Sequence, residues 1–224
     1  MKVIIQKEVK DEYSPIIGVI YAENIDNSKE FEEIDNLFNE AFKQLKNIFS
    51  KYETLGQNPI ISAWRKVYKE FGTDPKRYCS SIESLVRRVI KGEEIPKINT
   101  LVDLYNYIFI KYITPVGGED IDKIEGNVYL ALADGSEDFL MIGSNENDPP
   151  KPEEVIYKDN KGVICRRWNW READRTKLTK ETKNAVIVID AVPPYEKELV
   201  EKATDELAKL IHNYCEGNIR TEIL

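Results

Sequence analysis

The period of the apolar residues changes once along the chain, and this change limits the possible folds more than any other feature. Between residues 27 and 112 the apolar positions follow the period of amphipathic helices, whereas from residue 123 to 192 they form short runs separated by turn residues. Short apolar runs at 3–5 and 15–21 precede the helical part, and a helical stretch at 199–214 closes the chain. This order predicts an α+β chain. Because no linker separates the parts, we expect residues 1–224 to form a single compact unit.

The helical part contains four predicted helices. Capping residues mark their starts, at Asn27, Asn58, Ser80 and Asn99. Gly72 and Gly92 are expected to close the second and third helices, since glycine is common just after a helix end. Pro115, Gly117 and Gly118 are expected to end the helical part in a turn.

The second half is expected to consist of strands. Residues 127–133 and 139–142 flank an Asp134-Gly135 turn dipeptide, which predicts a β-hairpin. Short strands are expected at 155–157 and 163–165. After Asn184 at its start, the segment 184–192 is apolar except for Asp190, so we expect a strand that is buried on both faces.

The composition excludes a membrane-spanning chain. Of the 224 residues, 42% are hydrophobic and 32% are charged, and no apolar run approaches the ~20 residues that a membrane helix needs. The N-terminal residues do not form a secretory signal or a transit peptide. We therefore expect a cytoplasmic protein with no membrane partner.

Few residues are available for metal or redox chemistry. The three cysteines, Cys79, Cys165 and Cys215, are too far apart in sequence for a paired metal or redox motif. The one histidine, His212, falls in the last predicted helix, where we expect it at the edge of the core rather than in a catalytic role. No glycine-rich nucleotide-binding motif is present. The sequence therefore predicts neither a metal site nor a cofactor.

The net charge of −8 is unevenly distributed. Residues 61–116 and 161–183 carry net charges of +4 and +5, whereas the other segments are acidic. A local basic patch is what an acidic protein needs to bind a polyanion. Solvated basic faces that pair with the acidic segments remain the alternative.

Tryptophan and arginine are concentrated in residues 165–177, CRRWNWREADRTK. Aromatic rings beside guanidinium groups suit the ends of single-stranded nucleic acids, because bases stack on the rings and arginine contacts phosphate. In the alternative interpretation, Trp168 and Trp170 pack in the core while the arginines lie outside.

Two motifs resemble the B3/B4 module, the editing domain of the phenylalanyl-tRNA synthetase beta subunit. INTLVDLYNY at residues 98–107 and PVGGEDIDKI at 115–124 are similar to a paired motif of that module, and TKETKN at 179–184 is similar to the segment before its buried strand. The resemblance spans residues 60–215, and residues 1–58 are expected to add N-terminal strands and a helix that pack on it. It implies a B3/B4-like fold of central mixed sheets with flanking helices.

The resemblance also implies a function. The family's module hydrolyses tyrosine that is wrongly attached to phenylalanine tRNA, so we expect a trans-acting aminoacyl-tRNA deacylase whose partners are the aminoacylated 3′ end of a tRNA and a synthetase, not DNA. The synthetase's aminoacylation core is absent from these residues, so the chain is not expected to charge tRNA. The alternatives are a non-catalytic module that binds tRNA, an amino acid or a synthetase, and an unrelated small-molecule hydrolase on the same scaffold.

The expected site combines residues from two segments. Asp174 or Glu172 is expected to orient the attacking water, and the N–H groups of Gly117 and Gly118 to stabilise the oxyanion, unless these glycines form a plain turn. The expected substrate-binding residues are Asn106, Trp168, Asn169, Trp170, Arg166, Arg167, Arg171 and Arg175. Gly117 stands where bacterial editing domains usually carry a histidine, and Asp174 stands near the position of a pocket glutamate. The prediction requires the two segments to form opposite walls of one cleft.

Overall fold

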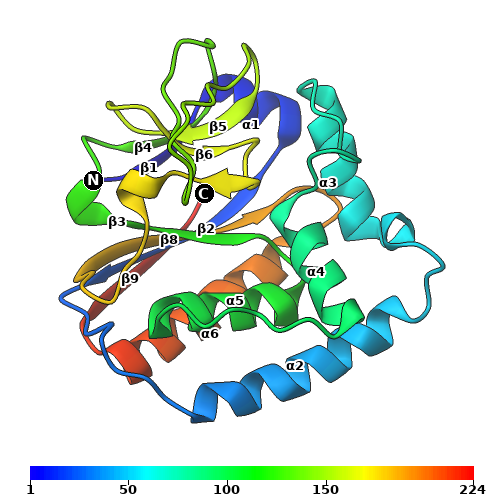
Figure 1. Cartoon of the computed structure of the whole chain (residues 1–224), viewed down its shortest axis with the longest axis vertical. Coiled ribbons are helices and arrows are strands. Elements are labelled where there is room, and N and C mark those ends of the chain that lie inside the picture. Colours follow the sequence, from blue (N-terminus) through cyan, green and yellow to red (C-terminus); the bar gives the residue numbers. More distant parts are fainter.

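The computed structural model describes all residues from Met1 to Leu224 and contains two β-sheets and a layer of helices (Figure 1). Sheet A has the strand order β1 (Val3–Ile5), β4 (Val128–Leu132), β5 (Val155–Lys158), β6 (Val163–Arg166) and β7 (Arg171–Glu172). Sheet B has the order β3 (Val116–Asp120), β8 (Asn184–Ala191), β2 (Ile16–Glu23) and β9 (Asn218–Ile223). β1 and β4 are parallel and all other neighbouring strands are antiparallel. The predicted α+β class with mixed sheets is confirmed.

Six helices surround the sheets: α1 (Lys7–Tyr13), α2 (Glu33–Phe49), α3 (Pro59–Glu70), α4 (Ser81–Lys91), α5 (Thr100–Tyr112) and α6 (Lys197–Cys215). Three short 3-10 helices are η1 (Leu55–Gln57), η2 (Ile121–Lys123) and η3 (Asp174–Thr176). Helices α5 and α6 cover one face of sheet B, and α2 packs on α5 (Figure 1). No helix is both long enough and apolar enough to span a membrane.

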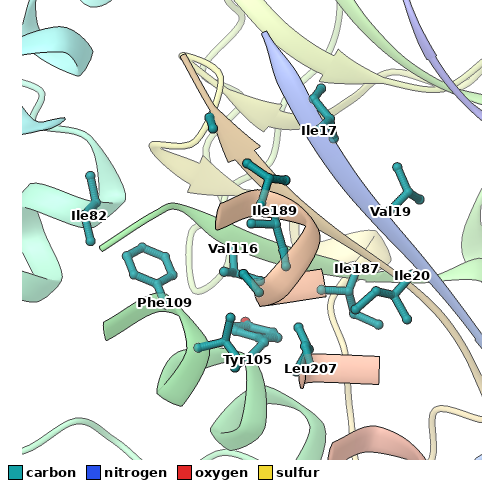
Figure 2. Packing of buried hydrophobic residues seen from close by; sticks show 14 of the residues in the cluster. Ile17, Val19, Ile20, Ile82, Tyr105, Phe109, Val116, Ile187, Ile189 and Leu207 are labelled. Atoms are coloured by element: carbon teal, nitrogen blue, oxygen red, sulfur yellow. The ribbon is translucent and has the colours of Figure 1, made fainter. Parts of the chain in front are cut away.

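The two faces of sheet B have different neighbours. Ile187 and Ile189 of β8 point toward α5 and α6, where Tyr105, Phe109 and Leu207 meet them (Figure 2). The alternate residues of β8 face the other way, toward sheet A, because successive side chains of a strand lie on opposite faces. This arrangement explains the continuous apolar run that predicted a doubly buried strand.

Helix α6 lies close to sheet B because Gly18 has no side chain. A Cβ at Gly18 would overlap the hydroxyl of Thr204 on α6. The Thr204 side chain instead donates a hydrogen bond to the carbonyl of Val200, at 2.8 Å. A glycine in the interior of a strand often marks such a close approach.

Most predicted helix starts agree with the structure. The side chains of Asn58, Ser80 and Asn99 accept hydrogen bonds from the first turns of α3, α4 and α5. The prediction for Asn27 was wrong, since α2 begins at Glu33. Asn27 is buried and joins distant segments instead, donating to the Thr179 carbonyl at 2.8 Å and accepting from the Leu101 N–H at 2.8 Å.

Two predictions about turns and strands also need correction. Residues 116–120 form the edge strand β3 rather than a turn, because the two glycines pair with β8. The predicted hairpin between 127–133 and 139–142 does not form, because β4 pairs with β1 and β5. Residues 140–142 lie instead beside β7, where the Ile142 N–H donates to the Glu172 carbonyl at 3.1 Å.

Candidate functional site

A cavity of about 400 Å³ lies between the two sheets. Sheet B contributes Gly117 to Glu119 of β3 and the inward residues of β8, while sheet A contributes residues of β5 and β6, the turn after β6, and β7. Ser81 at the start of α4 and residues 141–142 complete the lining. The cavity is mostly apolar and contains a few polar groups, which is typical of ligand sites. It brings together the glycine segment and the tryptophan and arginine segment.

The backbone of β3 directs part of its hydrogen-bonding groups away from sheet B. The Asp190 N–H donates to the Pro115 carbonyl at 2.9 Å, and the register then pairs Gly117 with Val188. Because alternate residues of an antiparallel strand point their backbone groups in opposite directions, the Gly117 N–H faces β8 and the Gly118 N–H faces the open edge. Of the two glycines proposed to stabilise an oxyanion, Gly118 is the one whose N–H is directed outward.

Glu172 lies at this open edge. Burial raises the pKa of its carboxyl to about 7, and the Gly118 N–H, which hydrogen-bonds to it, acts in the opposite direction. A Cβ at Gly117 would lie 3.1 Å from Glu172 Oε1, so glycine leaves space for the carboxyl to reach the strand. A carboxyl with this pKa exchanges protons readily near neutral pH, as a general base requires.

Glu119 is a second carboxyl on the same wall. It is 7% exposed, and burial and the negative charge of Glu172 raise its pKa well above the usual range, although the positive charge of Arg175 acts in the opposite direction. Two carboxyls that share a site do not both ionise easily. Glu119 is therefore the member of the pair that retains its proton, and Glu172 is the member that ionises near neutrality.

Asp190 lies at the other end of the cavity floor. It lies four positions along β8 from Val186, the partner of Glu119, which corresponds to about 13 Å along the strand. Burial raises the pKa of Asp190 to about 7, opposed by the Tyr157 hydroxyl, which donates to Asp190 Oδ1 at 2.6 Å. The cavity therefore has carboxyl groups at both ends and valines between them.

The turn between β6 and β7 carries four of the predicted binding residues, at positions 167–170. Trp168 is fully buried and packs edge-on against Trp64 and Tyr13, while its ring also lines the cavity. Asn169 and Trp170 line the cavity as well. Arg167 and Trp168 have φ values of 48° and 65°, in the left-handed region that bulky residues rarely adopt. This strained turn aims the next two side chains at the cavity.

The four predicted arginines have different surroundings. Arg166 is buried and donates to both Glu154 oxygens at 2.9 and 2.8 Å, and Arg175 donates to both Asp159 oxygens at 3.0 and 2.6 Å. Arg167 is buried between two aromatic rings. Only Arg171 is exposed and also lines the cavity. Since the others are buried or ion-paired, Arg171 is the one of the four that is free to meet a phosphate in solution.

Two other predicted site residues lie outside the cavity lining. Asp174 begins η3 and accepts from Lys177 Nζ at 2.7 Å. Asn106 is on α5, the helix on the opposite face of sheet B. Glu172 is therefore the carboxylate of the predicted pair that the structure brings to the cavity.

Sequence reasoning missed Glu119, Asp190, Tyr157 and Ser81 as parts of the site. Asp190 had a signal, since it is the one polar residue inside an apolar strand. Glu119 follows the two glycines directly, but its inward direction depends on β3 being a strand. No group of three or more His, Cys, Asp or Glu side chains is arranged to hold a metal ion.

Comparisons with known proteins agree with this fold. The phenylalanine–tRNA ligase beta subunit of Fusobacterium nucleatum subsp. nucleatum is 26% identical over 118 residues, which are 53% of this chain and 14% of that protein. A solved N-terminal fragment of the phenylalanyl-tRNA synthetase beta-subunit from Pyrococcus horikoshii has a TM-score of 0.51 at 14% identity. The match covers 98% of this chain and 50% of the fragment, and it shows a common fold.

This chain thus spans half of the solved fragment and a small part of the ligase subunit. The family model of the B3/4 domain matches residues 63–216, which is more than half of the chain and includes the whole cavity lining from β3 to β8. The chain therefore belongs to the B3/4 domain family.

Proposed function

We propose that this protein is a trans-acting aminoacyl-tRNA deacylase, which hydrolyses the ester between an amino acid and the 3′ end of a tRNA in the cytoplasm. The observation that carries the proposal is Glu172, a carboxyl with a pKa of about 7 in a largely apolar cavity, next to an outward backbone N–H. An ester hydrolase needs a positioned base and donors for the developing negative charge. The family relationship supports tRNA as the carrier of the ester.

In the proposed reaction, ionised Glu172 accepts a proton from a water molecule while the water oxygen bonds to the ester carbonyl carbon. The carbonyl oxygen becomes negatively charged at the open edge of β3. The Val116 N–H leaves the sheet on the same side as the Gly118 N–H, because the two residues alternate with Gly117. Since the Gly118 N–H is directed at Glu172, the Val116 N–H is the donor proposed to stabilise the oxyanion.

The intermediate then collapses. The bond between the carbonyl carbon and the ribose oxygen breaks, and the proton held by Glu172 passes to that oxygen. The products are the free amino acid and a tRNA with its terminal hydroxyl restored. The apolar residues around the carboxyl limit its contact with bulk water, which strengthens every charge interaction in the cavity.

The test is an assay of ester loss from a panel of correctly and incorrectly charged tRNAs. Wild-type protein is expected to accelerate hydrolysis of at least one of them, and Glu172→Gln is expected to slow it about 10²-fold or more. Glu201→Gln, on the exposed side of α6, serves as a control with an unchanged rate.

Asp174→Asn tests the other carboxylate that the sequence suggested. A large loss of rate in Asp174→Asn with none in Glu172→Gln would transfer the base role to Asp174. If the protein binds charged tRNA but no ester is lost, its function is that of a non-catalytic binding module and not of a deacylase.

A further inference from the structure

Unpartnered polar atoms gather around the cavity. Seven buried side-chain nitrogen or oxygen atoms have no hydrogen-bond partner, and four of them belong to cavity-lining residues: Ser81, Glu119, Trp168 and Asn169. Buried polar groups in native proteins are nearly always hydrogen-bonded. Donors left free on a cavity wall therefore indicate a bound group that supplies acceptors.

Asn169 presents a donor whose orientation is fixed. Its Oδ1 accepts from the Tyr68 hydroxyl at 2.9 Å and from the Ser81 N–H at 3.4 Å. Exchanging the amide oxygen and nitrogen would place the NH2 group against the Ser81 N–H, donor against donor. Asn169 is 9% exposed, and its Nδ2 has no partner. The Ser81 Oγ also has none, so two residues that line the cavity, and that are joined through the Ser81 N–H, each keep a buried donor without a partner.

Arg167, two residues before Asn169, carries a buried positive charge and does not itself line the cavity. Its guanidinium lies between the rings of Tyr78 and Trp170, at 3.9 and 4.2 Å from their centroids, and its Nη1 has no partner. The closest carboxylate is Glu154, 3.9 Å from Arg167 Nε, but Glu154 already binds Arg166 through both oxygens. Arg167 is 4% exposed and has no carboxylate of its own.

We propose that Ser81 and Asn169, backed by the charge of Arg167, form a subsite for the phosphate group of the nucleotide that carries the ester. The proposal rests on the proposed function. The α-carboxyl group of the amino acid is consumed in the ester, so for every amino acid except aspartate and glutamate an anion that enters with the substrate belongs to the nucleotide. The start of α4 adds the positive end of a helix dipole to the same wall.

The position of the subsite also suits a nucleotide. Ser81 and Trp170 are partly exposed, and Arg171 is exposed, so this wall is open to solvent. At the floor, Val186 is buried and Val188 is partly exposed. The amino-acid side chain is expected to occupy the apolar floor, and the nucleotide to remain at the opening.

Two synthetic substrates test this assignment. One is the 3′-aminoacyl ester of adenosine, and the other is the same ester of adenosine 5′-monophosphate, with an amino acid that the protein removes from tRNA. Wild-type protein is expected to hydrolyse the ester of adenosine 5′-monophosphate with a kcat/KM about tenfold or more above that for the adenosine ester, because the phosphate adds charge-assisted hydrogen bonds. Ser81→Ala is expected to lose most of this preference, whereas Ser84→Ala, one turn along α4, retains it.

The two proposals fail in different ways. If wild-type protein hydrolyses both esters with equal kcat/KM, the phosphate subsite is wrong and the deacylase proposal stands. If neither ester is hydrolysed, the deacylase proposal fails. The subsite is then tested by NMR, in titrations of the protein with adenosine 5′-monophosphate, adenosine and inorganic phosphate. The phosphate subsite is supported if adenosine 5′-monophosphate and inorganic phosphate both bind and Ser81→Ala weakens their binding. It is overturned if neither of them binds.

Discussion

Replacement of Asp190 by Asn is expected to remove a pH-dependent loss of stability. Asp190 is 2% exposed and its carboxyl pKa is about 7 in the folded chain, because burial disfavours the charged form. Asn keeps an oxygen that accepts from the Tyr157 hydroxyl and has nearly the same shape. The variant therefore changes the ionisation and leaves the packing in place.

The size of the effect follows from the difference between the two states. An Asp carboxyl in the unfolded chain has a pKa near 3.8, whereas the folded value is about 7. Between these values the unfolded state gives up its proton first, so the wild type loses stability as the pH rises, at 1.36 kcal/mol per pH unit. From pH 4 to pH 8 the loss amounts to about 4 kcal/mol. Below both pKa values the carboxyl is protonated in the folded and the unfolded state, so Asp190 no longer makes the stability depend on pH.

Urea unfolding of both proteins at several pH values, followed by tryptophan fluorescence, measures this difference. The free energy of unfolding of Asp190→Asn relative to wild type is expected to rise by about 4 kcal/mol between pH 4 and pH 8. Glu119 and Glu172 affect both proteins equally and cancel in the comparison. A difference that stays constant across this range, with near-UV circular dichroism showing the same fold, would refute the reasoning about the buried carboxyl.

Three further substitutions have distinct expected outcomes. Arg166→Ala is expected to destabilise the protein by about 3–5 kcal/mol in urea unfolding, because it leaves buried Glu154 without its partner; a loss below about 1 kcal/mol would contradict this. Arg171→Ala is expected to change stability by no more than about 0.5 kcal/mol but to weaken tRNA binding and flatten its salt dependence, as binding titrations at several salt concentrations would show. Gly18→Ala is expected to cost about 1–3 kcal/mol of thermal or urea stability, because a methyl group there meets Thr204 on α6, and an unchanged midpoint would argue against that close approach.

The sequence predicted the fold class because its strongest signals are local. Capping residues such as Asn58 and Asn99 act within one helical turn, and the apolar run of β8 reflects burial on both faces. The short helix α1 and the polar strand β9 were missed. Of the six residues of β9, three are exposed and none is buried, and its two apolar residues, Ile219 and Ile223, give too short an alternation to predict a strand. Its position depends on pairing with β2, far away in sequence.

The candidate site was predictable in outline. Gly118 and Glu172 were both candidates, and their meeting depends on the contact between the edge strands of two sheets. Which arginines are free was not predictable, because Arg166 and Arg175 find their carboxylates through tertiary pairing. The role of Asn27, which joins the first turn of α5 to Thr179 rather than starting a helix, arises in the same way.

The pH dependence of ester hydrolysis under single-turnover conditions tests the central claim about Glu172 most directly. The rate of the wild type on a charged tRNA that it deacylates is expected to rise with pH and to level off above a pKa of about 7, where Glu172 becomes fully ionised. In Glu172→Gln the rate is expected to be about 10²-fold lower and to lack this transition. A transition near pH 7 that persists in Glu172→Gln would contradict the assignment of Glu172 as the base.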